Sequence, residues 1–190
     1  FPVFACSVSV FVTGRFAKEL SAPRALSGSL EVGSLRSAVA GCPALVEPHL
    51  ARLAKTCEAP LVALNTALFE DGAFVRLPAG SAVEAPIHLV HLALPGAGPS
   101  ASHPRTLVVA ERGSRATVIE DFVSLGAGRT LTNAVTEIAL GEGASLEHVT
   151  LQREHEDAAH LATLHVRQER DSLYKAHGIS LGGTMTRNDL

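Results

Sequence analysis

Residues 134–151 read AVTEIALGEGASLEHVTL, and this stretch decides the fold. Alternate positions of its first half carry side chains suited to the buried face of a strand: Ala134, Thr136, Ile138 and Leu140. The triplet Gly141-Glu142-Gly143 then supplies the residues of a tight turn. A second strand is predicted from about Ala144. The stretch therefore predicts two β-strands joined by a short turn.

The same strand–turn–strand pattern recurs at intervals of 28 residues. Four sets of apolar or β-branched positions follow this spacing: Val108, Thr136 and Leu164; Ala110, Ile138 and Val166; Val118, Leu146 and Tyr174; Val123, Leu151 and Ile179. A fixed period of strands is typical of coils stacked on one another, as in a parallel β-solenoid. We therefore expect Ile138 and Val166 to point into the solenoid, stacked with Ala110.

The first part of the chain has a different pattern. We expect a small N-terminal strand and helical region over residues 1–72 and a β-helix over residues 73–190. Ser34 fits the cap of a first short helix that Gly41 ends, Pro43 the first turn of a second helix that reaches Leu53, and Pro60 the start of a third. One face of the third helix is predicted to carry Leu61, Leu64, Leu68 and Phe69. Two segments are predicted to be loops: residues 17–33 and 95–104.

The sequence stops at Leu190, directly after strand-like residues. We therefore expect the β-helix to be truncated at its C-terminal end and the chain to be a piece of a longer protein. An uncovered last coil would leave free strand edges, so we also expect possible homo-association of this fragment.

Composition narrows the classes of function. The 190 residues carry a formal net charge of −3 with no basic cluster, which argues against a nucleic-acid partner. The longest apolar run, residues 1–12, is shorter than a membrane span and lacks the features of a signal peptide. Three widely spaced cysteines, Cys6, Cys42 and Cys57, favour a reducing, cytoplasmic location and read most simply as small buried hydrophobic residues.

Common catalytic motifs are absent from the sequence. No lysine follows a glycine as a phosphate-binding P-loop requires, and there is no G-x-S-x-G motif of a nucleophilic serine. Gly126-Ala127-Gly128 lacks the third glycine of a dinucleotide-binding motif and is predicted to be a loop. We therefore predict that the chain is not an enzyme and assign no catalytic or cofactor-binding residue.

Nine histidines raise the possibility of a metal site. His88 and His91 are three positions apart on a predicted strand, so they should face opposite sides. The 28-residue spacing stacks His148 with Glu120 and Ala176, and no column collects two histidines, so a structural or solvent-facing role is expected. His155 and His160 accompany the acidic residues Glu154, Glu156 and Asp157, and this run is predicted to be a solvated loop. We assign no metal ligand.

Five segments together resemble the SufB/SufD family of the SufBCD iron–sulfur cluster assembly complex, and its SufD branch in particular. They are FVTGRF (11–16), LNTALFEDG (64–72), VEAPIHLV (83–90), LTNAVTEIALGEGASLEHVTLQRE (131–154) and SLGGTMTRNDL (180–190). They occur in family order through most of the chain. The resemblance implies a right-handed parallel β-helix after a helical N-terminal region, in agreement with the periodicity.

The resemblance also implies a function. A SufD-like protein is a non-catalytic subunit that pairs with SufB and with the ATPase SufC, and iron or an iron–sulfur cluster belongs to the whole complex. The family's cluster-related residues and SufC-binding helices lie beyond this sequence, so none is carried over. Two other classes stay open: a metal-dependent cupin-like enzyme, which needs converging histidines, and an extracellular carbohydrate-processing β-helix, which usually has shorter coils and an export signal.

Overall fold

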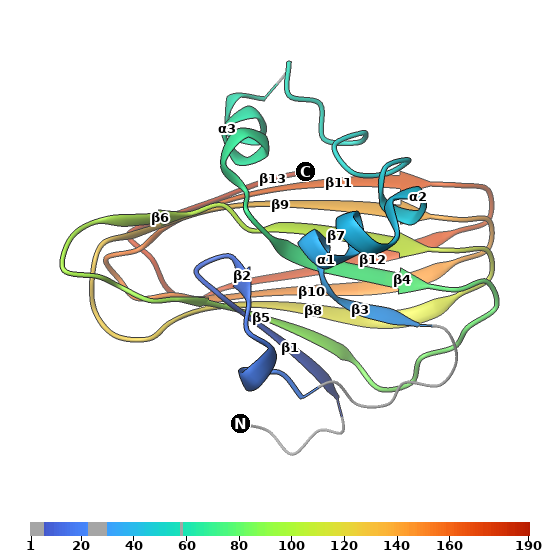
Figure 1. The fold of residues 1–190 in the computed structure, drawn as a ribbon, viewed down its shortest axis with the longest axis horizontal. Helices are drawn as coiled ribbons and strands as arrows, with labels where there is room; N and C mark the ends of the chain where they lie inside the picture. The colour runs from blue at the N-terminus through green and yellow to red at the C-terminus, as the bar shows by residue number, and fades with distance from the viewer. Residues whose placement is uncertain (1–5, 23–29, 58) are drawn as a thin grey trace.

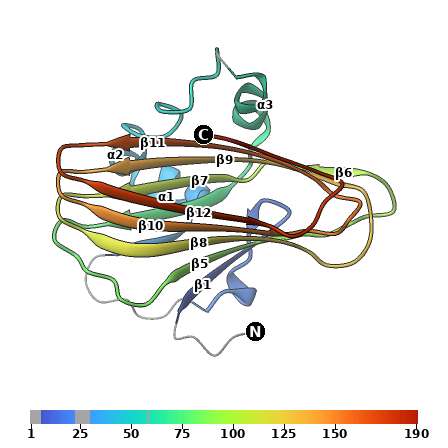
Figure 2. The ribbon, with the colours of Figure 1, turned by 180° about the vertical axis from the view of Figure 1, so that it is seen from behind.

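The structure is a computed structural model that describes residues 6–22, 30–57 and 59–190. It is mainly β, and its centre is a parallel β-solenoid of about four turns. Two sheets face each other across the interior, and the chain passes from one to the other in every turn (Figures 1 and 2). The predicted fold class is therefore confirmed.

We call the two sheets A and B. Sheet A contains β12 (Leu173–Ser180), β10 (Ser145–Arg153), β8 (Arg115–Ser124), β5 (Ile87–Ala93), β1 (Ser7–Val12) and β2 (Arg15–Phe16), in that order. Sheet B contains β13 (Met185–Asp189), β11 (Ala159–Gln168), β9 (Thr130–Leu140), β7 (Arg105–Ala110), β4 (Gly72–Leu77) and β3 (Glu31–Ser34). A short strand, β6 (Ser100–Ser102), pairs with β9 inside the segment predicted to be a loop.

The spacing between stacked turns is not constant. Ile138 pairs with Val166, as predicted, 28 positions along the chain. However, Val108 pairs with Ile138 and Ala110 with Leu140, so the predicted stack of Ala110 on Ile138 is wrong by two residues. The cause is the loop after β8. Eight positions separate Val123 from Leu131, whereas six separate their partners Arg153 and Ala159.

The turns that lead from sheet B to sheet A are also stacked, and each has one residue with a positive φ angle: Gly80 (70°), Gly113 (68°), Gly143 (66°) and Asp171 (57°). The N–H of Gly113 donates to the carbonyl of Glu142 in the next turn, and the N–H of Gly143 donates to Arg170. Glycine adopts this left-handed conformation without steric cost, and aspartate is among the few other residues that tolerate it. The turn predicted at Gly141-Glu142-Gly143 is confirmed.

The apolar core lies inside the solenoid, toward these turns. Val75, Ile87, Val118, Ile138 and Leu146 are among its fully or almost fully buried members, and Leu164 and Val166 pack against it. Because side chains alternate along each strand, one face of each strand supplies this core. The predicted inward position of Ile138 is confirmed.

The N-terminal strands join both sheets. β1 lies parallel to β5, with Ser7 opposite Ile87, and β2 turns back antiparallel to β1 at Gly14. In sheet B, β3 pairs antiparallel with β4. The segment 17–33 was predicted to be a loop, but it contains the 3₁₀ helix η1 (Lys18–Leu20) and the start of β3; residues 23–29 lie outside the described residues.

Three short helices cover the outer face of sheet B (Figure 1). Helix α1 (Leu35–Gly41) is capped by the Ser34 hydroxyl, which accepts a hydrogen bond from the N–H of Ser37, as predicted. Helix α2 (Pro43–Val46) is shorter than predicted and gives way to turns before Leu53. None of the described helices has the length and apolar character needed to cross a membrane.

Helix α3 (Pro60–Leu68) begins at Pro60, as predicted, but is turned differently. Its buried residues are Val62 and Asn65, whereas Leu64 and Leu68 are 40% and 51% exposed. The helix is apolar on nearly all sides, so its sequence pattern does not define which side meets the sheet. The Asn65 amide fixes the side of α3 that faces the sheet, because it donates to the carbonyl oxygens of Pro104 and Asn133 at 2.9 and 2.8 Å.

Candidate functional site

The interior of the solenoid is polar in the half that lies away from the stacked turns. Its centre is the carboxylate of Glu120 on β8, which is 2% exposed. Thr106 and Thr136 donate to its two oxygens at 2.6 and 2.9 Å, and His148 Nε2 lies 2.9 Å from Oε2. We call this group the Glu120 cluster; its members are His91, Thr106, Glu120, Thr136, His148 and Tyr174.

The two histidines of the Glu120 cluster have different surroundings. His148 also contacts the Tyr174 hydroxyl through Nδ1 at 2.8 Å, so both of its ring nitrogens have a partner. The ring of His91 is stacked between Phe11 and Phe122, with centroids 5.2 and 4.7 Å apart. Its Nε2 is 3.7 Å from Glu120 Oε1, beyond hydrogen-bonding distance.

These contacts determine the charge of the carboxylate. Burial alone raises the pKa of Glu120, but the hydrogen bond with His148 and the nearby imidazole of His91 outweigh it and hold the pKa well below its usual value. Burial and the nearby Glu120 charge raise the pKa of the Tyr174 phenol. Glu120 is therefore ionised in the interior and Tyr174 is neutral.

A second buried carboxylate lies next to this cluster. Glu154 accepts hydrogen bonds from Thr132 at 2.5 Å and, more weakly, from Gln152 at 3.4 Å, and its Oε2 is 2.8 Å from His160 Nδ1. Despite the cost of burial, these contacts lower the pKa of Glu154. His160 is fully buried, so the predicted solvated loop is wrong at both Glu154 and His160. Phe122 separates the two groups and contacts the rings of both His91 and His160.

The histidine predictions are otherwise mixed. His88 and His91 do face opposite sides: His91 approaches Glu120 inside, and His88 approaches Asp121 outside at 3.3 Å. However, His148 pairs with Val118 rather than with Glu120, which it reaches diagonally because this turn has 30 residues. Of the two expected roles, structural or solvent-facing, His148 has the structural one. The side chain of His177 is 54% exposed and faces solvent.

One column of sheet A does contain two histidines, contrary to prediction. His88, Ile119, Val149 and His177 stand in register across four strands. The two histidines are three strand spacings apart, about 14 Å, which is too far for them to bind one ion. Among the described residues, no group of three or more His, Cys, Asp or Glu side chains is arranged to hold a metal ion.

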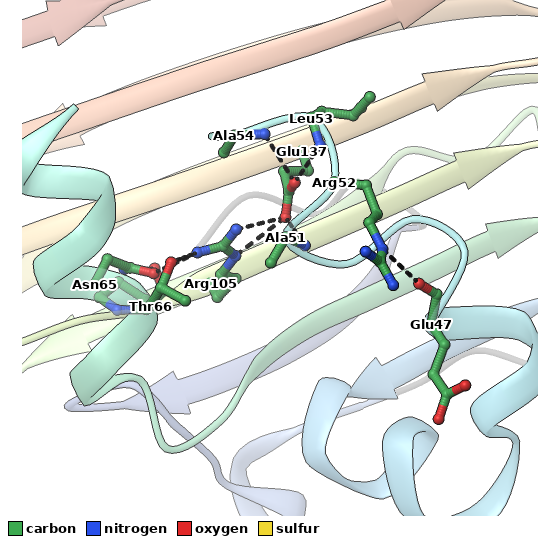
Figure 3. A network of polar contacts seen from close by, with 10 residues as sticks. Glu47, Ala51, Arg52, Leu53, Ala54, Asn65, Thr66, Arg105 and Glu137 are labelled. Carbon is green, nitrogen blue, oxygen red and sulfur yellow. Dashed lines mark hydrogen bonds and ion pairs between the residues drawn. The ribbon is translucent and has the colours of Figure 1, made fainter. Parts of the chain in front are cut away.

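The outer face of sheet B has a buried ion pair that the sequence analysis did not identify. Arg105 on β7 contacts Glu137 on β9 at 2.7 Å, and both side chains are fully buried (Figure 3). Nη1 of Arg105 donates to Asn65 Oδ1 and Thr66 Oγ1 of α3 at 3.1 and 2.8 Å. The signal in the sequence is one glutamate, Glu137, which is the only charged residue of β9 and stands at an outward position.

Glu137 also fixes the chain that precedes α3. Its two oxygens accept hydrogen bonds from the backbone N–H groups of Ala51, Leu53 and Ala54 at 2.9 to 3.0 Å (Figure 3). Ala51 has a φ angle of 56°, unusual for alanine, which these contacts help to hold. The Arg105–Glu137 pair therefore ties the N-terminal region to the solenoid.

A third charged group lies on the outer face of sheet A. Arg153 makes a bidentate contact with the Asp121 carboxylate at 3.0 and 2.7 Å, and His88 Nε2 contacts the same carboxylate at 3.3 Å. Burial raises the pKa of Asp121, but these two partners lower it more.

The cysteines were expected to be small buried residues. Cys42 and Cys57 are exposed, so this expectation is wrong for these two.

The described structure also contains a cavity of about 200 Å³ beside the Glu120 cluster. Glu120, Thr136, His148 and Gln152 contribute to its wall, together with Ala176 of β12. The site as a whole is thus a buried, hydrogen-bonded set of acids and bases inside a scaffold. It can hold protons and fix the spacing of turns.

Sequence comparison assigns this architecture to a family. A family model described as "SUF system FeS cluster assembly, SufBD core domain" matches residues 93–190, which include most of the solenoid. A second, the SufBD protein N-terminal region, matches residues 1–89. The chain belongs to the SufBD family. The boundary between the two matches falls at the end of β5, so the N-terminal match contains the first solenoid strands as well as the helices.

Individual SufBD relatives agree with this assignment. An iron–sulfur cluster assembly SufBD family protein of Synechocystis is 31% identical over 189 residues, which are 95% of this chain and 42% of the relative. The iron–sulfur cluster assembly protein SufD of Escherichia coli is 28% identical over 182 residues, 95% of this chain and 40% of the relative. The chain thus spans about two fifths of the length of these relatives. The family is one of iron–sulfur cluster assembly.

Proposed function

We propose that this chain is part of a SufD-type subunit of an iron–sulfur cluster assembly complex, acting as a non-catalytic scaffold. The observation that carries the proposal is the match to both SufBD family models along nearly the whole chain. The similarity to SufD of Escherichia coli supports the SufD type. The solenoid supports the scaffold role, because its interior is filled with side chains and leaves its surfaces for contacts with other proteins.

The proposed partners are the SufB and SufC homologues of the same organism. Iron or a nascent iron–sulfur cluster is the cargo of the whole complex in this proposal, and no residue of this chain is assigned as its ligand. We further propose a cytoplasmic location. The three cysteines are free within the described structure, as expected in a reducing compartment.

The two alternative functions have less support. A cupin-like metal enzyme requires histidines that converge on an open site, whereas His91 and His148 are buried and already arranged around one carboxylate. A carbohydrate-processing β-helix has no specific observation in its favour here.

The test uses the full-length protein that contains this chain. It should be co-expressed with tagged SufC and SufB homologues, purified, and analysed by size-exclusion chromatography with light scattering. The proposal expects a stoichiometric complex, and restored activity of an iron–sulfur enzyme in an Escherichia coli strain that lacks SufD. Rescue of a strain that lacks SufB instead would overturn the SufD type. Absence of any complex, with folded protein, would overturn the scaffold role.

A further inference from the structure

The Glu120 cluster connects all four turns of the solenoid. His91 lies on β5 in the first turn, and Thr106 and Glu120 lie on β7 and β8 in the second. Thr136 and His148 lie on β9 and β10 in the third, and Tyr174 lies on β12 in the fourth. Because each member contacts the carboxylate or His148, a change of charge at this one place acts on the whole stack.

The two histidines differ in their capacity to carry a charge. A doubly protonated imidazole has two N–H donors, and a buried donor without an acceptor is costly. His148 has an oxygen within hydrogen-bonding distance of each ring nitrogen. Both ring nitrogens of His91 lack a hydrogen-bond partner among the described residues, and phenylalanine rings cover its two faces.

The hydrogen-bond partners of the pair are neutral hydroxyls, and Asp189 and the exposed His177 also line the adjoining cavity. Inside the solenoid, Glu120 and His148 face the hydroxyls of Thr106, Thr136 and Tyr174. The nearest other interior acid and base, Glu154 and His160, form their own pair beyond Phe122. Arg105 and Glu137 lie on the outer face of sheet B, and Asp121, Arg153 and His88 lie on the outer face of sheet A.

We propose that the interior binds one proton at His148, so that an imidazolium–carboxylate pair with Glu120 links the second and third turns, while His91 stays neutral. In this state His148 donates one N–H to Glu120 and the other to the Tyr174 hydroxyl. When the pH rises and the proton leaves, Glu120 loses its counter-ion, and Tyr174 must reverse its hydrogen bond and donate to Nδ1. The solenoid therefore has a proton-dependent contact between its turns.

The direct test is nitrogen-15 NMR of histidine-labelled chain, which distinguishes an imidazolium from each neutral tautomer. At neutral pH, His148 should show two protonated ring nitrogens and His91 one. His148→Gln and His91→Gln assign the two signals, and the exposed His177→Gln serves as the control that leaves both unchanged. A neutral His148 at neutral pH, or a doubly protonated His91, would overturn the proposal.

Two further variants test the partners. Tyr174→Phe removes the oxygen that accepts from Nδ1, and Glu120→Gln removes the counter-ion. Each should convert His148 to a neutral tautomer at neutral pH, with the fold checked by the spectrum of the remaining amides. If Glu120→Gln is too unstable to study, Tyr174→Phe alone decides, because its ring keeps the packing. Persistence of the imidazolium signal in folded Tyr174→Phe would show that the geometry around Nδ1 does not set the charge.

Discussion

Glu137 and Ile138 are neighbours in β9, and both are fully buried on opposite faces of the same sheet. Ile138 points into the solenoid among Val108, Leu140 and Val166, while Glu137 points outward to Arg105 beneath the N-terminal region. One strand therefore holds two different interiors, an apolar one within the solenoid and a charged one between the solenoid and its helical cover.

Truncation of Ile138 tests the apolar interior. Ile138→Ala should lower the free energy of unfolding by about 2–5 kcal/mol, because the deleted atoms leave a cavity among packed turns. Urea denaturation followed by circular dichroism measures the change. Ile179→Ala, at a position 46% exposed, is the matched control and should cost well under half as much. Equal effects of the two substitutions would contradict the inward position of Ile138.

Removal of one partner tests the buried ion pair. Arg105→Met should cost about 3–5 kcal/mol, because it leaves the Glu137 carboxylate buried without its counter-ion. The double variant Arg105→Met with Glu137→Leu should recover part of this loss, although Ala51, Leu53 and Ala54 lose their acceptor. A double-mutant cycle in urea measures the coupling. A coupling near zero would mean that the contact does not hold the helical region in place.

The stacked turns predict a specific cost at Gly143. Gly143→Ala should destabilise the protein by about 1–2 kcal/mol, since alanine is strained at a φ of 66°. Nothing blocks the new methyl group, so the effect measures backbone conformation alone. Gly178→Ala is the control, with free space around its Cα and no positive φ. Thermal melts that rank the two variants the other way would refute this explanation of the turn.

The orientation of α3 predicts which of its apolar residues matter for stability. Val62→Ala should lower the free energy of unfolding by about 1 kcal/mol or more, because Val62 is fully buried. Leu64→Gln and Leu68→Gln should each stay within about 0.5 kcal/mol of the original chain, as is usual for exposed positions. Chemical denaturation of the three variants in parallel is sufficient, and a large loss at Leu64 or Leu68 would mean that this face is covered.

The Glu120 carboxylate predicts the response to acid. Its pKa in the folded chain lies well below the value of 4.5 that it regains on unfolding. The contribution of Glu120 to stability is therefore complete above that value and is lost as the pH falls, because the unfolded state takes up the proton first. The free energy of unfolding should decline less steeply below about pH 4.5 in Glu120→Gln than in the original chain. The same slope in both would place the acid-sensitive group elsewhere.

Alternation along the strands was sufficient to predict the solenoid and the inward face of β9, but not the register between turns. Side chains return to the same face every second residue, so turns of 28 and of 30 residues bury the same positions. The predicted register already stacked His148 with Glu120, which it reaches diagonally in the true register, but it did not show that the pair is buried. A histidine and a glutamate 28 positions apart then appear as a stacked pair on a polar surface.

The helical region shows a different limit of the sequence. Helix starts were predictable at Ser34, Pro43 and Pro60, because capping residues and proline act locally. The rotation of α3 was not, because it depends on hydrogen bonds from Asn65 to carbonyl groups about 40 and 70 positions away. The Arg105–Glu137 pair has the same character: each residue alone is an ordinary charged residue, and only the packing of the N-terminal region makes them a buried pair.

The antiparallel strands β2 and β3 make the two ends of the solenoid different. Each is paired with the outermost parallel strand at the N-terminal end, β1 in sheet A and β4 in sheet B, and each runs against it. A further parallel turn cannot continue the stack there without displacing them. New turns, whether duplicated during evolution or added by design, can therefore extend the solenoid only at the end formed by β12 and β13. Both reversed strands are also short, and short edge strands reduce the edge-to-edge polymerisation to which regular β-stacks are prone.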